Sequence, residues 1–214
     1  MRFNRPVGMG GLHRLGAFAA ALTLTACSTL PEPPVRPAVY DFGPGMLVLP
    51  ATNRMALLPP ITLGEVDAPL SLDSTAVLYR LTYADAQQLR PYALARWSMP
   101  PAQLVRQRLR ESLGQRRSVL NSGEGGAVVP AQLLRVELEE FSQLFESAGK
   151  SVGLVRWRAS LWDQKGGSEQ LRAQRSFVVQ RPASSADAAG GVRALTAATD
   201  AAVDELAQWL AQVQ

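Results

Sequence analysis

The chain has 214 residues, 47% of them hydrophobic, with a formal net charge of +4, one histidine and one cysteine. This length suits a single globular domain. Three arginines before residue 15 account for most of the charge: without residues 1–26, 19 basic residues face 18 acidic ones. The high isoelectric point therefore gives no support for nucleic-acid binding, and we expect no nucleic-acid partner.

Residues 1–26 have the layout of a secretory signal peptide. Residues 1–14, "MRFNRPVGMGGLHR", are basic and contain no acidic residue, and residues 15–26, "LGAFAAALTLTA", are uncharged and mostly apolar. A basic region followed by about 7–15 apolar residues and then small residues is typical of such signals, and the run is shorter than the roughly 20 residues that span a bilayer. A buried helix is the alternative, but the proline-rich stretch that follows disfavours it.

The only cysteine, Cys27, follows this apolar run directly. Leu24-Thr25-Ala26-Cys27 resembles the bacterial lipobox, in which the cysteine thiol is acylated and the chain is cut before it. Two or more acyl chains hold a protein stably on a membrane, and lipidation explains a cysteine without a disulfide partner. A free thiol and an intermolecular disulfide are the alternatives. By resemblance to enterobacterial sorting rules, Ser28 in place of an aspartate favours the outer membrane.

The segment after Cys27 reads as a spacer followed by strands. Residues 28–38, "STLPEPPVRPA", hold four prolines, which favour an extended, semi-rigid conformation. The pattern predicts strands in "MLVLP" (46–50), in residues 54–69 and in "TAVLYRLTYA" (75–84), where alternate residues from Val77 to Tyr83 share a face. Residues 89–97 are a further candidate, in which Pro91 predicts an edge strand or a bulge.

The rest of the chain predicts a helix, three long strands and a second helix. Pro100 and Pro101 mark the first helix, because proline fits a first helical turn. Residues 131–141, 152–162 and 169–180 alternate apolar and polar side chains and are joined by short connections, which predicts an antiparallel meander with one buried face. A break at 181–191 precedes an apolar helical stripe over 192–213. We therefore predict an α+β fold, a mostly antiparallel sheet with two long helices packed on one face.

Several of these features together resemble the ABC-type transport auxiliary lipoprotein family of the PqiC type. They are the lipobox at Cys27, Tyr40-Asp41-Phe42, Val77-Leu78-Tyr79-Arg80 followed by Tyr83, Arg96-Trp97-Ser98-Met99-Pro100 before the first helix, and the meander with its closing helix. The resemblance implies a signal peptide (1–26), an acylated cysteine and linker (27–39) and the family's domain (40–214).

The resemblance also implies a function. Such lipoproteins serve an ABC permease, its ATPase and an MCE-domain protein that move lipids or other hydrophobic compounds between two membranes. The chain would be anchored through acylated Cys27 to the outer-membrane bilayer, on the periplasmic face. Lipid is a further candidate, as a ligand of the domain itself.

Little in the sequence predicts catalysis, and we expect no enzyme, cofactor or metal site. His13 lies in the segment expected to be removed, and there is no nucleophile elbow or phosphate-binding loop. The carboxylates of Glu137, Glu139 and Glu140 fit either acid–base chemistry or a strand face whose cross-strand partners are Arg156 and Arg158; we favour the second.

A set of aromatic and arginine side chains is the candidate partner-binding surface, because such residues often dominate interface energetics. They are Tyr79, Tyr83, Tyr92, Arg96 and Trp97. The alternative is that they fill the core. Two other functions stay open: an assembly or activator lipoprotein that docks on an outer-membrane barrel or cell-wall synthase, and a direct lipid carrier, which needs an apolar cavity.

Overall fold

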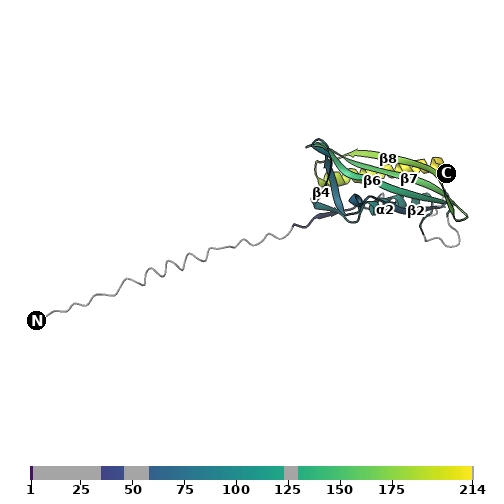
Figure 1. Cartoon of the computed structure of the whole chain (residues 1–214), viewed down its shortest axis with the longest axis horizontal. Helices are drawn as coiled ribbons and strands as arrows, with labels where there is room; N and C mark the ends of the chain where they lie inside the picture. The colour runs from purple at the N-terminus through teal and green to yellow at the C-terminus, as the bar shows by residue number, and fades with distance from the viewer. Residues whose placement is uncertain (2–34, 46–57, 123–129, 214) are drawn as a thin grey trace. The chain divides into compact units, whose positions relative to one another are not determined.

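The computed structural model describes Met1 and residues 35–45, 58–122 and 130–213. The expected signal peptide, Cys27, most of the linker and the strand expected at 46–50 therefore lie outside the described residues. Residues 36–214 form one compact unit (Figure 1). Its elements are β1 (Ala38–Tyr40), β2 (Ile61–Asp67), the 3₁₀ turn η1 (Leu70–Leu72), β3 (Ala76–Leu81), β4 (Asp85–Trp97), α2 (Pro101–Gly114), β5 (Val119–Asn121), β6 (Gln132–Ser147), β7 (Lys150–Lys165), β8 (Ser168–Pro182) and α3 (Ala188–Val213).

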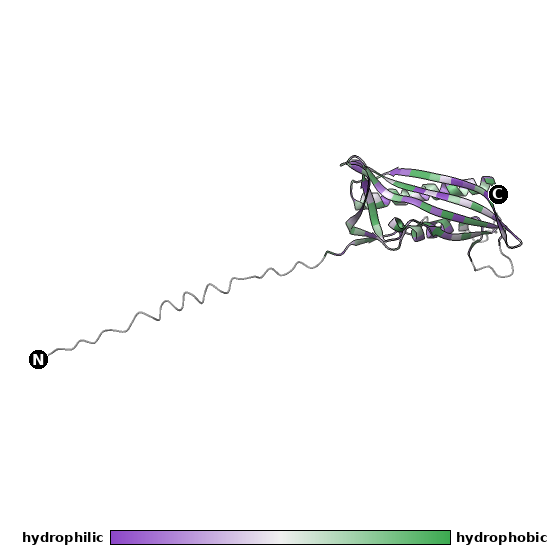
Figure 2. Ribbon diagram, viewed as in Figure 1, coloured by the Kyte–Doolittle hydropathy of each residue, from purple (hydrophilic) through white to green (hydrophobic). Residues whose placement is uncertain are grey.

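The predicted meander is confirmed. β6 pairs with β7 and β7 with β8, both antiparallel and over almost their full lengths. Hydropathy alternates along these strands, as Figure 2 shows. On the face that carries the helices, Leu134, Leu138, Trp157 and Phe177 are buried. Removing side chains of this size from water stabilises a fold by roughly 1.5–3 kcal/mol each, so this face forms the core.

Along the edge of β6 that does not pair with β7, the structure has parallel pairings that the sequence pattern does not predict. β2 pairs in parallel with the start of β6, from Leu133 to Glu137, and β3 pairs in parallel with its end, from Gln143 to Phe145. β5 extends the sheet beside β2, while β4 and then β1 extend it beside β3. The described sheet is therefore mixed, although most of its paired residues are antiparallel.

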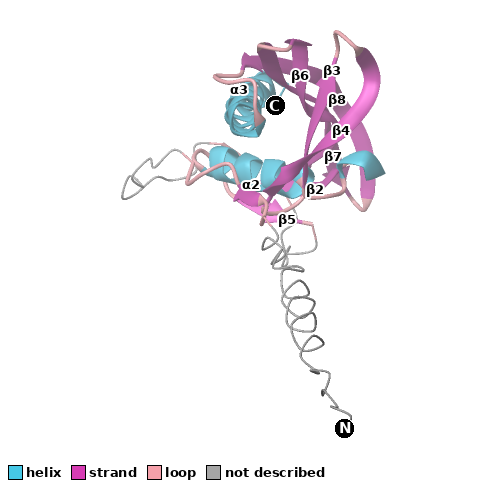
Figure 3. Cartoon of the chain, turned by 90° about the vertical axis from the view of Figure 1, so that its left-hand side faces the viewer, coloured by secondary structure: helices cyan, strands magenta, loops and turns pink. Residues whose placement is uncertain are grey.

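Both helices lie on the same side of the curved sheet, as predicted (Figure 3). α3 packs on β6, β7 and β8, whereas α2 packs on β2 and β5 and also contacts α3. The contact of α3 with the sheet is close at two glycines. A Cβ atom at Gly153 would lie 2.6 Å from the backbone of Ala194, and one at Gly191 would overlap the Gln143 side chain.

The start of α3 differs from the prediction. The expected break at 181–191 ends earlier, because α3 begins at Ala188. Asp187 caps it: its Oδ1 accepts a hydrogen bond from the Gly190 N–H at 2.7 Å and another from the Ser185 hydroxyl. Glycine is a poor helix former, so the sequence alone favours a later start. The cap and the close packing of Gly191 on Gln143 outweigh that preference.

The bulge predicted at Pro91 is confirmed. The pairing of β3 with β4 shifts between Leu78, which lies opposite Pro91, and Ala76, which lies opposite Arg96. Proline has no N–H to donate, and a bulge is one of the few places where a sheet accepts it. Tyr83, expected on the strand face with Val77, instead lies in the turn between β3 and β4.

Candidate partner-binding surface

Three aromatic rings meet where the β3–β4 hairpin joins β6. The ring centroids of Tyr79 and Tyr92 are 4.6 Å apart, and Phe145 meets Tyr79 edge-on at 5.9 Å. Tyr79 lies directly opposite Gln143, so its ring is on the sheet face that carries the helices. These contacts fasten the hairpin to the long strand β6.

A buried polar chain continues from this aromatic group. The Tyr92 hydroxyl donates to Gln143 Oε1 at 2.8 Å, and Gln143 Nε2 donates to Ser151 Oγ at 2.8 Å. Burial, with further contributions from Tyr79 and Asp187, raises the pKa of Tyr92 well above its usual value. The hydroxyl therefore keeps its proton and stays a hydrogen-bond donor. Tyr79 and Tyr92 thus position the hairpin rather than face solvent directly.

The tip of the hairpin presents Tyr83, whose side chain is 53% exposed. Its neighbour Thr82 donates both its N–H and its hydroxyl to the Phe145 carbonyl, at 3.0 and 2.6 Å. Arg80 donates to the carbonyls of Ala86 and Gln87, and its Nη2 lies 3.1 Å from Glu140 Oε2. The tip is held from both sides, so Tyr83 is an exposed aromatic ring on an ordered support.

Arg96 and Trp97 lie away from this tip. Arg96 is half-buried and donates to the carbonyls of Tyr92 and Ala95. Trp97 is only 2% exposed and packs edge-on against Phe42 and Phe141, with centroid distances of 5.7 and 5.6 Å. The structure therefore brings Tyr79 and Tyr92 together, places Tyr83 on the surface at the tip of the same hairpin, and puts the Trp97 ring in the core.

Arg108 is a structural residue that the sequence analysis did not single out. It is 9% exposed, its Nη2 donates to the Phe42 carbonyl at 2.6 Å, and its Nε lies 3.3 Å from Asp200 Oδ1. One guanidinium thus joins α2, α3 and the segment after β1. A signal was present, since Arg108 falls on the apolar stripe of its helix, four residues after Leu104 and three after Val105.

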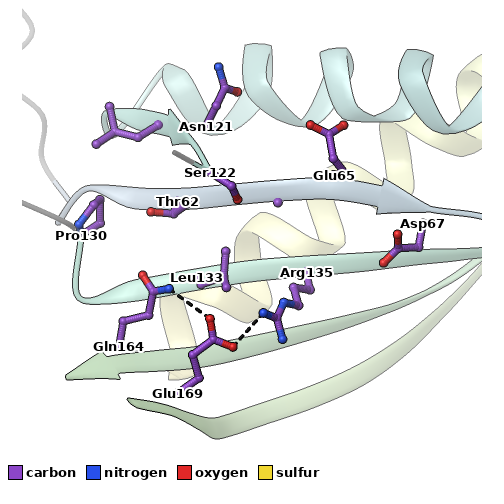
Figure 4. A pocket seen from close by; sticks show the side chains of 12 residues that line it. Thr62, Glu65, Asp67, Asn121, Ser122, Pro130, Leu133, Arg135, Gln164 and Glu169 are labelled. Atoms are coloured by element: carbon purple, nitrogen blue, oxygen red, sulfur yellow. Dashed lines mark hydrogen bonds and ion pairs between the residues drawn. The ribbon is translucent and has the colours of Figure 1, made fainter. Parts of the chain in front are cut away.

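A hollow of about 410 Å³ opens on the other face of the sheet, at the start of β6 (Figure 4). Gly64 and Leu133 contribute to its lining, and Arg135, Gln164 and Glu169 line one side. Arg135 pairs with Glu169 at 2.7 Å and lies 5.2 Å above the Trp162 ring. Sites for acyl chains are mainly apolar, so this mixed, charged lining fits polar contacts better. The sequence could not reveal the hollow, because the parallel pairing of β2 with β6 creates it.

Two glutamates of β6, Glu139 and Glu140, form ion pairs with arginines on the same outer face. A bulge at Glu139 leaves Glu140 opposite Arg156. Glu139 pairs with Arg156 at 3.1 Å and with Arg158 at 2.6 Å. This is the favoured alternative of the sequence analysis, a strand face with cross-strand partners.

Two kinds of feature are absent from the part of the chain that the structure describes. In 35–45, 58–122 and 130–213, no group of three or more histidine, cysteine, aspartate or glutamate side chains is placed to hold a metal ion. No helix in those ranges combines the length and the apolar character needed to cross a membrane.

The comparisons with known proteins come from a family model and from solved structures. A family model described as the ABC-type transport auxiliary lipoprotein component matches residues 47–207. A protein from Xanthomonas campestris of the DUF330 family aligns with a TM-score of 0.60 and 20% identity over 71% of this chain and 83% of its own. An uncharacterized protein aligns with a TM-score of 0.59 and 16% identity over 82% of this chain and 99% of its own.

A third structure extends the fold similarity to a distant sequence. A hypothetical protein from Chlamydia trachomatis aligns with a TM-score of 0.50 and 6% identity over 72% of this chain and 96% of its own. At these identities the structures show a shared fold. No curated protein matches the chain.

Proposed function

The chain belongs to the ABC-type transport auxiliary lipoprotein component family, and from this premise we propose that it is an outer-membrane lipoprotein that docks an intermembrane lipid transporter. It is a non-enzymatic subunit whose partners are an MCE-domain protein and, through it, the ABC permease and ATPase. The observation that carries the proposal is the family match, which covers residues 47–207 and so includes β2 to most of α3.

The lipobox supports the membrane anchor of this proposal. Acylation of Cys27 leaves a mature chain of residues 27–214, in which the expected linker, 27–39, leads into the folded domain, and the last two residues of that linker already belong to β1. Two or more acyl chains give stable attachment, and by resemblance to enterobacterial sorting rules Ser28 favours transfer to the outer membrane. The domain then stands on the periplasmic face.

The packing of the domain favours docking over carriage of lipid. Side chains from β6, β7 and α3 fill the face between sheet and helices, with Leu138, Trp157 and Leu206 fully buried. The hollow at Arg135 is open to solvent and has a mixed lining with charged side chains. A carrier needs an apolar cavity that covers most of its ligand. We therefore assign lipid movement to the partner subunits and docking to this chain.

Tyr83 is the contact residue that we propose for the partner. It is the exposed ring of the predicted set, and Tyr79 and Tyr92 hold the hairpin that carries it. Tyrosine contributes a large, rigid contact area, which makes it common at the centre of interfaces.

Photocrosslinking in cells tests both the partner and the surface. A photoreactive phenylalanine replaces Tyr83 in the full-length chain, and a matched chain carries it at the exposed Arg116 of the α2–β5 connection. We expect an ultraviolet-dependent product with an MCE-domain protein from position 83 and little from position 116. A product with a barrel protein or a cell-wall synthase would instead support the assembly function, and equal products from both positions would contradict the assigned surface.

A further inference from the structure

The strand β8 is a long edge of the sheet. Within the described part of the chain it pairs with β7 alone. Its pairing shifts once, near Arg172, and from Ala173 to Pro182 the register is regular. Nine residues before Pro182 thus present a regular edge of about 30 Å. Exposed edges of this kind accept an added strand, and natural proteins usually guard them.

The register shows which backbone groups face outward. The Ala183 N–H donates to the Ser151 carbonyl at 2.9 Å, and these residues lie directly opposite, one position beyond the Pro182–Val152 pair. In an antiparallel pair, hydrogen-bonded and non-hydrogen-bonded residues alternate. The odd-numbered residues of β8 therefore bond β7, and the N–H and C=O groups of Gln174, Ser176, Val178 and Gln180 point to the free edge.

The side chains along this edge have a symmetric pattern. On the face that carries α3, Arg175 and Arg181 flank Phe177 and Val179, which are buried. The Arg175 guanidinium lies 5.0 Å over the Phe177 ring, and Arg181 donates to the Gln180 carbonyl. In the described residues neither arginine forms an ion pair with a carboxylate. On the other face, Val178 is 58% exposed.

From this pattern we propose that β8 binds an extended segment of a partner protein as a ninth strand. The segment carries acidic residues six positions apart, beside Arg175 and Arg181, and apolar residues at the two alternate positions between them, beside Phe177 and Val179. Because the pattern acid–apolar–apolar–acid is symmetric, it fits either strand direction. Cross-strand pairs of opposite charge stabilise such a ladder.

A second copy of the chain fits this edge poorly. Antiparallel pairing of two β8 strands over residues 173–181 is centred on Phe177 and sets Arg175 opposite Val179 and Arg181 opposite Ala173, so no acidic side chain faces either arginine. A register centred on Val178 places Arg175 of each copy opposite Arg181 of the other. Like charges directly opposite each other destabilise a sheet. The charge pattern thus favours an acidic partner segment, and the proposal holds whether or not that partner is a transporter subunit.

Peptide binding to the protein purified from membranes in detergent micelles tests the proposal. The probe is the fluorescein-labelled peptide TETVTVTET, and the control is TKTVTVTKT, which has the same spacing and the opposite charge. We expect the acidic peptide to bind at least tenfold more tightly, as measured by fluorescence polarisation. Exchange of both charges, Arg175→Glu with Arg181→Glu, is expected to reverse the preference.

A backbone variant tests the strand pairing itself. Val178→Pro removes an N–H that points to the free edge and leaves the bonds to β7 intact, so we expect the fold to be retained. Val178→Thr keeps this N–H. We expect about tenfold weaker binding for the proline variant and no change for the threonine variant. Equal binding to both, or no binding of either peptide to the unaltered protein, would overturn the proposal and leave the arginines as guards against edge aggregation. If circular dichroism shows that Val178→Pro does not fold, the charge exchange alone decides.

Discussion

At the scale of single residues, Arg108 and Asp200 show how a charge is held inside this domain. The guanidinium of Arg108 reaches a backbone carbonyl after β1 and the carboxylate of α3. Asp200 is half-buried, and burial raises its pKa even though Arg108 lowers it; Asp204 and Glu111 add to the rise. Desolvation of the carboxylate thus outweighs the ion pair, which is common for buried pairs.

Replacement of Arg108 is expected to destabilise the domain. Arg108→Leu removes the hydrogen-bond donor of the Phe42 carbonyl and the ion-pair partner of Asp200, and we expect a loss of about 2 kcal/mol in the free energy of unfolding. Urea titration followed by tryptophan fluorescence measures it. Arg116→Leu, at an exposed position, is the matched control and should change stability by about 0.5 kcal/mol or less. Equal losses in both variants would contradict the role of Arg108.

The raised pKa of Asp200 leads to a prediction about how the stability of the domain depends on pH. Its pKa in the folded state is raised, so the stability that it contributes is fully present below the usual aspartate pKa of about 3.9 and is lost as pH rises through the higher folded value. Asp200→Asn lacks this titration. We therefore expect the variant to gain stability relative to the unaltered chain as pH rises from 4 to 7, as measured by urea midpoints at both pH values. A constant difference would show that Asp200 has no raised pKa.

At the scale of elements, the sequence predicted each strand of the meander and both helices but not how all strands pair. Alternation in β6, β7 and β8 indicates which face of each strand is buried, and the short connections indicate which strands pair with each other. For β3, alternation gives the buried face but not the neighbouring strand, because the parallel pairing of β2 and β3 with β6 joins residues 64 to 71 positions apart. The hollow at Arg135 depends on that pairing and was missed. Trp97 was ambiguous for the same reason: its core partner Phe141 comes from β6.

The close packing of α3 on the sheet gives a prediction at this scale. Gly153→Ala places a methyl group 2.6 Å from the backbone of α3, which must move away. Overpacking of this kind costs about 1–3 kcal/mol, and we expect the upper part of that range because the obstacle is backbone. Gly149→Ala, in the β6–β7 turn with nothing within 4 Å, is the control and should be nearly neutral. Thermal unfolding of both variants measures the difference, and a neutral Gly153→Ala would show that α3 packs less tightly.

At the scale of the whole molecule, the strand directions place the hairpin relative to the point where the chain enters the domain. β1 is parallel to β4, β4 is antiparallel to β3, and β3 is parallel to β6, so β1 runs opposite to β6. The chain therefore enters the sheet from the end at which β6 finishes. The β3–β4 hairpin with Tyr83 lies at that same end, because Leu81 pairs with Phe145. The hollow at Arg135 lies about 33 Å away along β6.

This arrangement predicts that linker length controls partner binding. If Cys27 is acylated, the room between the membrane and the hairpin end depends on residues 28–37, which would span about 31 Å in an extended proline-rich conformation. Deletion of residues 29–36 is expected to leave membrane attachment and thermal stability unchanged and to reduce the crosslink from position 83 severalfold, since a partner then has less room at the hairpin. Replacement of the same residues by glycine and serine, at constant length, gives a flexible spacer of shorter average reach and is expected to give an intermediate yield. An undiminished crosslink after the deletion would mean that the partner reaches the domain from another side. The Cys27→Ala variant tests the anchor separately: we expect it to lose palmitate labelling and to leave the membrane fraction.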